Sequence, residues 1–161
     1  MVKAAKLTGE ARNEAKHKGA GRDWATPPSL FALLHSVFDF TLDPCATPET
    51  AKCPRYYTEQ VNGLLRSWQG ERVFMNPPYG REIPAWTQKA KREAEGACLV
   101  VGLLPSATDL RWWHEDIEGA ADYVFLRGRP SFLTSAEGKR KNTTRTAFTP
   151  SAIVIWPRGA K

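Results

Sequence analysis

The chain has 161 residues, of which 42% are hydrophobic and 25% are charged, a composition typical of one soluble globular domain with a hydrophobic core. No apolar run approaches the roughly 20 residues that a membrane-spanning helix needs, which excludes a transmembrane protein. The stretch from Met1 to Arg22 lacks the apolar core of a signal peptide, so we expect a cytoplasmic protein.

The net charge of +6 at pH 7 is concentrated in two segments. Residues 1–22 contain six basic and two acidic side chains, and residues 137–145 contain four basic side chains and one acidic one. The first segment is rich in small residues and is interrupted by glycines, which predicts a flexible tail. Residues 23–161 are then expected to form a single domain. Two basic segments beside a nearly neutral body suit contact with nucleic acid, but charge that merely keeps the protein soluble has the same composition.

The cysteines and histidines do not form a metal-binding pattern. Cys45, Cys53 and Cys98 include no CxxC pair, and the three histidines are scattered along the chain. We therefore expect no metal site, and we expect the thiols to be reduced and mostly buried.

The first predicted element is a helix that begins near Thr26, which can cap it, with proline in the first turn. The apolar face of this helix consists of Leu30, Phe31, Leu33, Leu34 and Val37. A short strand that ends at Asp43 follows, and its alternating apolar residues are Phe38, Phe40 and Leu42. Residues 47–71 are weakly patterned and predict no further regular element.

Later in the chain, strands and helices alternate. The predicted strands are residues 72–78, 97–105, 121–128 and 152–157, and the predicted helices are residues 83–96 and 108–119. The second helix is expected to open at Thr108 or Asp109. No helical pattern separates the last two strands, and residues 128–150 predict a basic loop there. This alternation predicts an α/β domain whose sheet is mainly parallel, with an antiparallel last strand.

Two polar residues follow predicted strands and are expected at one edge of this sheet. In such sheets ligands bind outside the carboxyl ends of the strands, where Asp43 and Asn76 both lie. A carboxylate such as that of Asp43 can hold an amine or a ribose hydroxyl. Considered alone, Asp43 is equally compatible with a loop aspartate that caps the next turn.

The stretch Asn76-Pro77-Pro78-Tyr79 predicts a site for a planar heterocycle that carries an amino group. The side-chain carbonyl of Asn76 and the backbone carbonyl of Pro77 can both accept hydrogen bonds from that amine. The two prolines restrict the loop that presents these acceptors. Tyr79 offers a flat face for stacking, worth roughly 1–3 kcal/mol per base in nucleic-acid sites. A proline-rich turn without function is the alternative.

An ordered set of motifs resembles the phage-type, Dam-like family of DNA N6-adenine methyltransferases. The set consists of DWATPPSLFALL, FTLDPCA, YYTEQVNGLLRSW, VFMNPPYG, LLPSATDLRWWH, GRPSF and SAIVIW. The resemblance implies a Rossmann-like methyltransferase sheet. Only 32 residues separate Asp43 from Asn76, too few for the two strand–helix units of a complete sheet, so we expect an abbreviated first half.

The resemblance also implies roles for individual residues. The catalytic loop would be Asn76, Pro77, Pro78 and Tyr79, and the cofactor S-adenosylmethionine would contact Thr26, Pro27, Phe31, Asp43, Pro44, Ala46 and Asn62. Asn62 departs from the family pattern, in which aspartate is commoner. The substrate would be an adenine flipped out of double-stranded DNA, and phage DNA protected against host restriction would be its setting. The protein would act as a monomer or homodimer.

The residues expected to contact DNA are Arg129, Lys139, Arg140, Lys141 and Arg145. A loop without DNA contact is the alternative. Among the tryptophans, Trp68, Trp86 and Trp156 are expected in the core, and one of the adjacent Trp112 and Trp113 is expected to be exposed. Two other functions remain open: methylation of RNA or of a protein glutamine amide, and nucleic-acid binding without catalysis.

Overall fold

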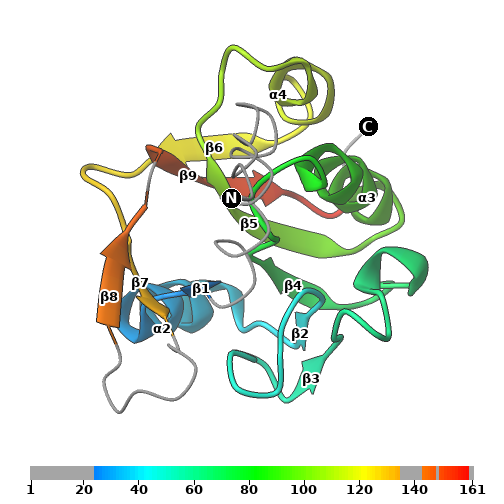
Figure 1. Cartoon of the computed structure of the whole chain (residues 1–161). Helices are drawn as coiled ribbons and strands as arrows, with labels where there is room; N and C mark the ends of the chain where they lie inside the picture. Colours follow the sequence, from blue (N-terminus) through cyan, green and yellow to red (C-terminus); the bar gives the residue numbers. More distant parts are fainter. Residues whose placement is uncertain (1–23, 135–142, 148, 160–161) are drawn as a thin grey trace, which may run out of the picture.

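The computed structural model describes residues 24–134, 143–147 and 149–159 (Figure 1). The predicted tail, residues 1–22, lies outside the described residues. The elements are β1 (Trp24–Ala25), α2 (Pro28–Phe38), β2 (Leu42–Asp43), β3 (Arg55–Tyr56), the 3-10 helix η1 (Gly63–Leu65), β4 (Arg72–Met75), α3 (Ile83–Glu95), β5 (Leu99–Pro105), α4 (Arg111–Asp116), β6 (Asp122–Phe125), β7 (Ser131–Thr134), β8 (Thr143–Thr146) and β9 (Ser151–Trp156). None of the described helices is both long and apolar enough to cross a membrane.

The main sheet has six strands in the order β3-β2-β4-β5-β9-β6. The neighbours β3, β2, β4 and β5 run parallel, whereas β9 is antiparallel to both β5 and β6. Five strands therefore share one direction, and the predicted mainly parallel sheet with an antiparallel last strand is confirmed. The apolar run at residues 99–105 forms a central strand, as expected.

The first half of the sheet is abbreviated. All of residues 44–71 are described, and they contain β3 and η1 but no α-helix. A side chain at Gly63 would place its Cβ 2.0 Å from the carbonyl oxygen of Pro44, so η1 packs directly against the turn after β2. The Trp68 indole N–H donates to the Gly63 carbonyl at 3.0 Å. Direct loop packing thus replaces a crossover helix.

Helices cover the two faces of the sheet unequally (Figure 1). On one face, α3 and α4 bury a core with Val100 and Leu104 of β5. On the other face, Val101 and Leu103 of the same strand pack with residues from α2 and from β7. Because successive strand residues point to opposite faces, β5 has to be apolar at every position.

The segment expected to be a basic loop, residues 128–150, contains two strands, so that expectation is wrong. Strands β7 and β8 pair antiparallel, and β1 adds to β7 as the third strand of a small second sheet. The register pairs Trp24 with Thr134, a contact across 110 residues of sequence. Strands this short show little alternation of apolar and polar residues, and no local sequence pattern predicts a partner so distant in the chain.

The region around α2 also departs from the sequence prediction. Phe38 belongs to α2, and the left-handed Asp39 (φ 49°, ψ 59°) turns the chain so that the Phe38 and Phe40 ring centroids lie 5.8 Å apart. A period-two pattern cannot distinguish this turn from a strand. Leu33 and Val37 are 64% and 69% exposed, so the expected apolar face is only partly buried. The N-cap is Pro27 rather than Thr26.

Most tryptophans lie in the core. Trp68, Trp86 and Trp156 are buried, as predicted. Trp112 and Trp113 are both buried, so the expectation that one is exposed is wrong. The short helix α4 is covered on two sides: it contacts α3, and the Trp113 ring stacks on Phe125 of β6 with centroids 6.0 Å apart. Helix α4 begins at Arg111, after the predicted start, and has no side-chain cap.

Candidate active site

The carboxyl ends of neighbouring strands bring Asp43 and Asn76 to one edge of the sheet. Leu42 of β2 pairs in parallel with Val73 of β4, and the two polar residues follow at the ends of these strands. Cys45 lies on the loop after Asp43, and burial raises the pKa of its thiol well above its ordinary value. The edge predicted from the sequence is therefore formed.

Asn76 is held through its side-chain nitrogen. The Nδ2 atom donates to the Thr26 hydroxyl oxygen at 3.1 Å. Thr26 is 2% exposed and lies between β1 and α2, so it contacts Asn76 instead of capping the helix. An acceptor buried this deeply cannot readily be replaced by solvent.

Tyr79 contacts one strand from each of the two sheets. Its hydroxyl donates to the Leu103 carbonyl of β5 at 3.3 Å. Its ring meets the Phe132 ring of β7 edge-on, with centroids 6.3 Å apart and an interplanar angle of 85°. Burial raises the pKa of the Tyr79 hydroxyl well above its ordinary value, so it stays protonated and remains a donor. Gly80, with φ +147°, then turns the chain toward α3 in a conformation that other residues rarely adopt.

Asp43 organises the loop that follows it. The carboxylate is 5% exposed and accepts backbone N–H groups from Lys52 at 3.1 Å and from Cys45 at 3.4 Å. Burial raises the pKa of this carboxyl from an ordinary 3.8 to about 6, although both N–H groups and the Lys52 ammonium favour the charged form. Its negative charge is therefore incompletely compensated.

This raised pKa makes protein stability depend on pH. The folded state binds the Asp43 proton more tightly than the unfolded state does, so the stabilising contribution is complete below about pH 4 and is lost as the pH rises through 6. A shift of this size corresponds to about 3 kcal/mol. We expect the free energy of unfolding of the wild type, relative to Asp43→Asn, to rise by that order between pH 7.5 and pH 4.

Urea unfolding of both proteins over this pH range measures the effect. The difference between the two proteins isolates Asp43, because all other titrating groups are shared. Parallel stability curves for wild type and Asp43→Asn would show that the folded pKa of Asp43 is not raised.

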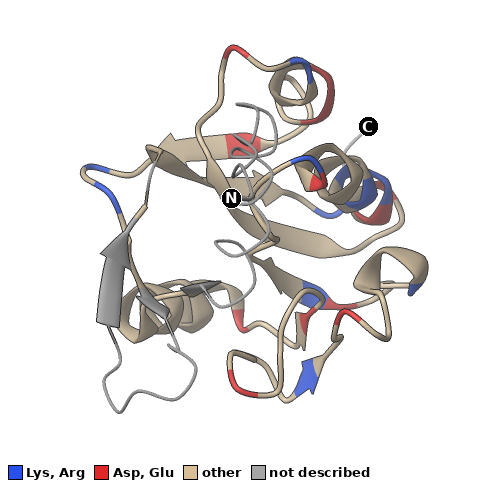
Figure 2. Cartoon of the chain, in the orientation of Figure 1, with Lys and Arg blue, Asp and Glu red and all other residues tan. Residues whose placement is uncertain are grey.

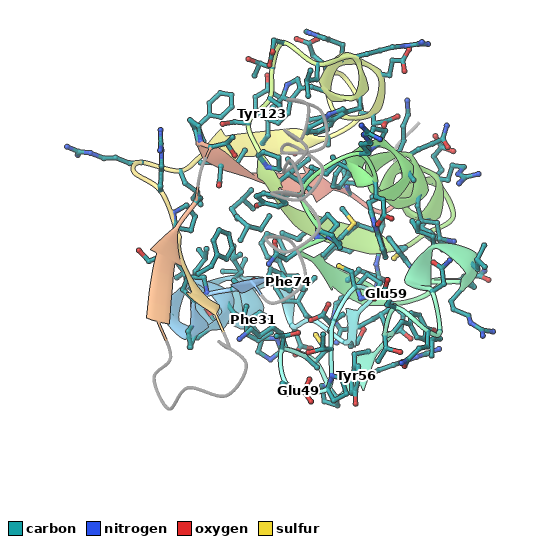
Figure 3. All side chains as sticks on the ribbon, viewed as in Figure 1. Phe31, Glu49, Tyr56, Glu59, Phe74 and Tyr123 are labelled. Carbon is teal, nitrogen blue, oxygen red and sulfur yellow. The ribbon has the colours of Figure 1, made fainter. Side chains whose placement is uncertain are left out.

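The other residues expected near a cofactor are buried or half-buried. Phe31 packs in the core, where its ring lies 5.1 Å edge-on from Phe74 (Figure 3). Asn62 adopts a left-handed conformation, and its side-chain oxygen accepts the Leu64 N–H at 3.2 Å and so caps η1. The remaining three are at least partly buried: Pro27, Pro44 and Ala46. Of these three, Pro44 and Ala46 lie on the loop that Asp43 organises.

Basic residues line an open hollow of about 400 Å³, which lies between the start of α2 and the connection from β6 to β7. Arg129 lines it, together with Arg127, and Figure 2 shows both basic positions on that connection. Arg145 lies in β8, paired with Phe132. Lys139, Arg140 and Lys141 lie outside the described residues.

Sequence patterns did not single out Arg127 as a residue for DNA contact, or the Leu103 carbonyl as the partner of Tyr79. For Arg127 the available signal was its position just beyond the carboxyl end of β6, the edge that already carries Asn76. The Leu103 carbonyl has no side-chain signal, since any residue supplies a carbonyl. Within the described residues, no group of three or more His, Cys, Asp or Glu side chains is arranged as metal ligands.

Comparison with known proteins finds a family model and two phage proteins that are similar to this chain. A family model described as DNA N-6-adenine-methyltransferase (Dam) matches residues 14–159. A protein of Haemophilus phage HP1 (strain HP1c1) with the same description is 29% identical over 136 residues, which cover 83% of this chain and 77% of the relative. One of Escherichia phage T1, again so described, is 27% identical over 133 residues. That match covers 72% of this chain but 56% of the T1 protein, so the chain spans little more than half of that relative.

Proposed function

Because the chain belongs to the DNA N-6-adenine-methyltransferase (Dam) family, we propose that it transfers a methyl group from S-adenosylmethionine to the N6 amino group of adenine in duplex DNA. The observation that carries this proposal is the placement of Asn76. It opens an Asn-Pro-Pro-Tyr loop at the carboxyl end of β4, beside the buried Asp43, with its side-chain nitrogen held by Thr26.

The chemistry of Asp43 fits the proposed cofactor. S-adenosylmethionine supplies an activated methyl group on a positively charged sulfonium, and its methionine part carries an ammonium. A buried carboxylate whose charge is incompletely compensated favours a cation nearby. Pro44, Cys45 and Ala46 lie on the loop that this carboxylate organises, and we assign the methionine part of the cofactor to that loop.

In the proposed reaction, Asn76 and Pro77 act on the amino group of the target adenine. The side-chain carbonyl of Asn76 and the backbone carbonyl of Pro77 accept hydrogen bonds from the two N6–H groups. The nitrogen lone pair then points away from these bonds and is available to the methyl group. Positive charge develops on N6 as its bond to the methyl group forms and the methyl–sulfur bond breaks, and the two carbonyl dipoles stabilise it. One N6 proton then leaves to water. Both acceptors lie in a loop stiffened by two prolines, so little reorganisation is needed during transfer.

Tyr79 is proposed to stack on the adenine after the base has left the duplex, a movement that costs a few kcal/mol. Its hydroxyl bond to the Leu103 carbonyl and its edge contact with Phe132 restrict rotation of the ring. A side chain that is already ordered loses less conformational entropy when a base stacks on it.

The hollow beside the start of α2 is proposed to receive the DNA backbone. Arg127 and Arg129 are exposed there and can bind phosphate without reading the sequence. Basic residues that follow β7 in the sequence, together with one in β8, would extend this contact: Lys139, Arg140, Lys141 and Arg145. We propose residues 1–22 as a further basic segment that approaches DNA, attached to the domain of residues 23–161.

Methyl transfer from isotope-labelled S-adenosylmethionine to unmethylated duplex DNA tests the proposal, with nucleoside analysis of the product and RNA as the parallel acceptor. We expect labelled N6-methyladenine from DNA. Label in RNA alone would change the substrate class, and cofactor binding without transfer to either nucleic acid would favour a protein amide. A protein that binds DNA but not the cofactor would be a binding module without catalysis.

A further inference from the structure

Two segments that are 50 residues apart meet at the candidate site, and both are unusually stiff. Thr26 precedes Pro27-Pro28, and Asn76 precedes Pro77-Pro78. A proline restricts the backbone of the residue before it and fixes its own φ. The hydrogen bond from Asn76 Nδ2 to the Thr26 hydroxyl therefore joins two side chains whose backbones have little freedom.

The backbone of Thr26 is fixed on both sides by regular structure. Trp24 and Ala25 pair with β7, in register with Thr134 and Leu133. On the other side, α2 begins at Pro28. The Phe31 N–H there donates a backbone hydrogen bond to the Pro27 carbonyl. Thr26 is thus the one residue between strand β1 and the N-cap, and it cannot follow Asn76 if that side chain rotates.

The bond to Thr26 also restricts the orientation of the Asn76 carboxamide, whose Nδ2 faces the hydroxyl. A carboxamide is planar, with a donor nitrogen and an acceptor oxygen on the same carbon. When Nδ2 is fixed on Thr26, Oδ1 takes the other position. A hydroxyl both donates and accepts, so the bond fixes the plane of the carboxamide, and without it the side chain turns freely about its terminal torsion.

We propose that Thr26 is a positioning residue that fixes the plane of the Asn76 carboxamide for its action on the target amine, a role distinct from contact with the cofactor. This inference rests on the proposed function. It assigns the orientation of the reacting loop to a residue of β1–α2, a segment outside the main sheet that is attached to β7.

The first test compares Thr26→Val, which keeps the shape but removes the hydroxyl, with Thr26→Ser, which keeps the hydroxyl. We expect Thr26→Val to lower kcat about tenfold, the kinetic equivalent of one hydrogen bond, and Thr26→Ser to recover most of the rate. The Kd for S-adenosylmethionine and the KM for DNA are expected to stay within about twofold, since neither molecule loses a contact.

Thr41→Val is the matched control. The Thr41 hydroxyl also forms a partly buried hydrogen bond, in which it accepts the Arg72 N–H at 3.0 Å. It lies at the opposite, amino-terminal edge of the sheet. This variant is expected to lose stability while keeping kcat. An equal loss of kcat in Thr41→Val and Thr26→Val would reduce the role of Thr26 to general stability and overturn the inference.

Two further outcomes separate the inference from the proposed function. Unchanged kcat in Thr26→Val, or weakened cofactor binding with unchanged kcat, would overturn the positioning role and leave the proposed function standing. If the wild type transfers no methyl group, the proposed function fails, and the side-chain ¹⁵N–H signals of Asn76 still test the hydrogen bond. We expect slowed hydrogen exchange of one Asn76 amide proton in wild type and Thr26→Ser; equal exchange in Thr26→Val would contradict the bond.

Discussion

Replacement of Asn76 by alanine is expected to lower kcat by about 10²- to 10³-fold, with binding of DNA and cofactor changed by no more than a few-fold. The variant removes one of the two carbonyls proposed to accept the N6 hydrogens and leaves the Pro77 carbonyl in place. The lost dipole acts where positive charge develops, so its removal affects the transition state more than the bound substrate. Single-turnover methyl transfer, measured with saturating DNA and cofactor, gives the change in rate.

Gln88→Ala provides the matched control, because it removes a carboxamide from an exposed position of α3. It is expected to keep the wild-type rate. The proposed mechanism is wrong if Asn76→Ala retains near-normal turnover while it still binds both ligands. A matching loss of cofactor affinity would instead move Asn76 from the reacting group to the cofactor pocket.

Replacement of Trp156 by alanine is expected to lower the free energy of unfolding by about 3–5 kcal/mol. Trp156 is fully buried at the end of β9 and packs against the α3–α4 face of the sheet. Its indole N–H also donates to the Asp116 carbonyl at 2.8 Å, which would lose this partner. Urea denaturation followed by circular dichroism measures the change from the transition midpoint and slope.

Two variants make the Trp156 result interpretable. Trp156→Phe keeps most of the buried apolar surface but removes the donor, so a smaller loss is expected. Leu65→Ala removes an apolar side chain that is largely exposed and is expected to change stability little. A loss below about 1 kcal/mol in Trp156→Ala would show that β9 contributes less to the fold than its position implies.

The sequence predicted the parts of the fold that repeat a strong local pattern. The strand at 99–105 is a continuous apolar run, which suits burial on both faces. The helix at 83–95 has apolar residues at helical spacing, which suits burial on one face. Asn76 was located because an apolar strand stops at two prolines. Since parallel strands end at one edge, the same pattern predicts Asp43 beside it.

The contacts that hold the site are tertiary, and local rules could not predict them. Thr26 obeys the rule for a helix cap, yet its hydroxyl binds Asn76, a competing partner 50 residues away. Strand β1 has two residues and exists because β7 lies beside it. Trp112 and Trp113 both lie inside because α4 is packed between two neighbours, whereas a helical pattern considers one face at a time.

Strand β9 makes the order of synthesis important for this fold. It is the last described strand in the chain, but it lies inside the sheet, between β5 and β6. On the ribosome, β6 has no strand to pair with until residues 151–156 emerge, and the apolar β5 keeps an open hydrogen-bonding edge until then. We therefore expect the sheet to close after translation of these residues, so nascent chains that stall before Ser151 would expose an aggregation-prone edge.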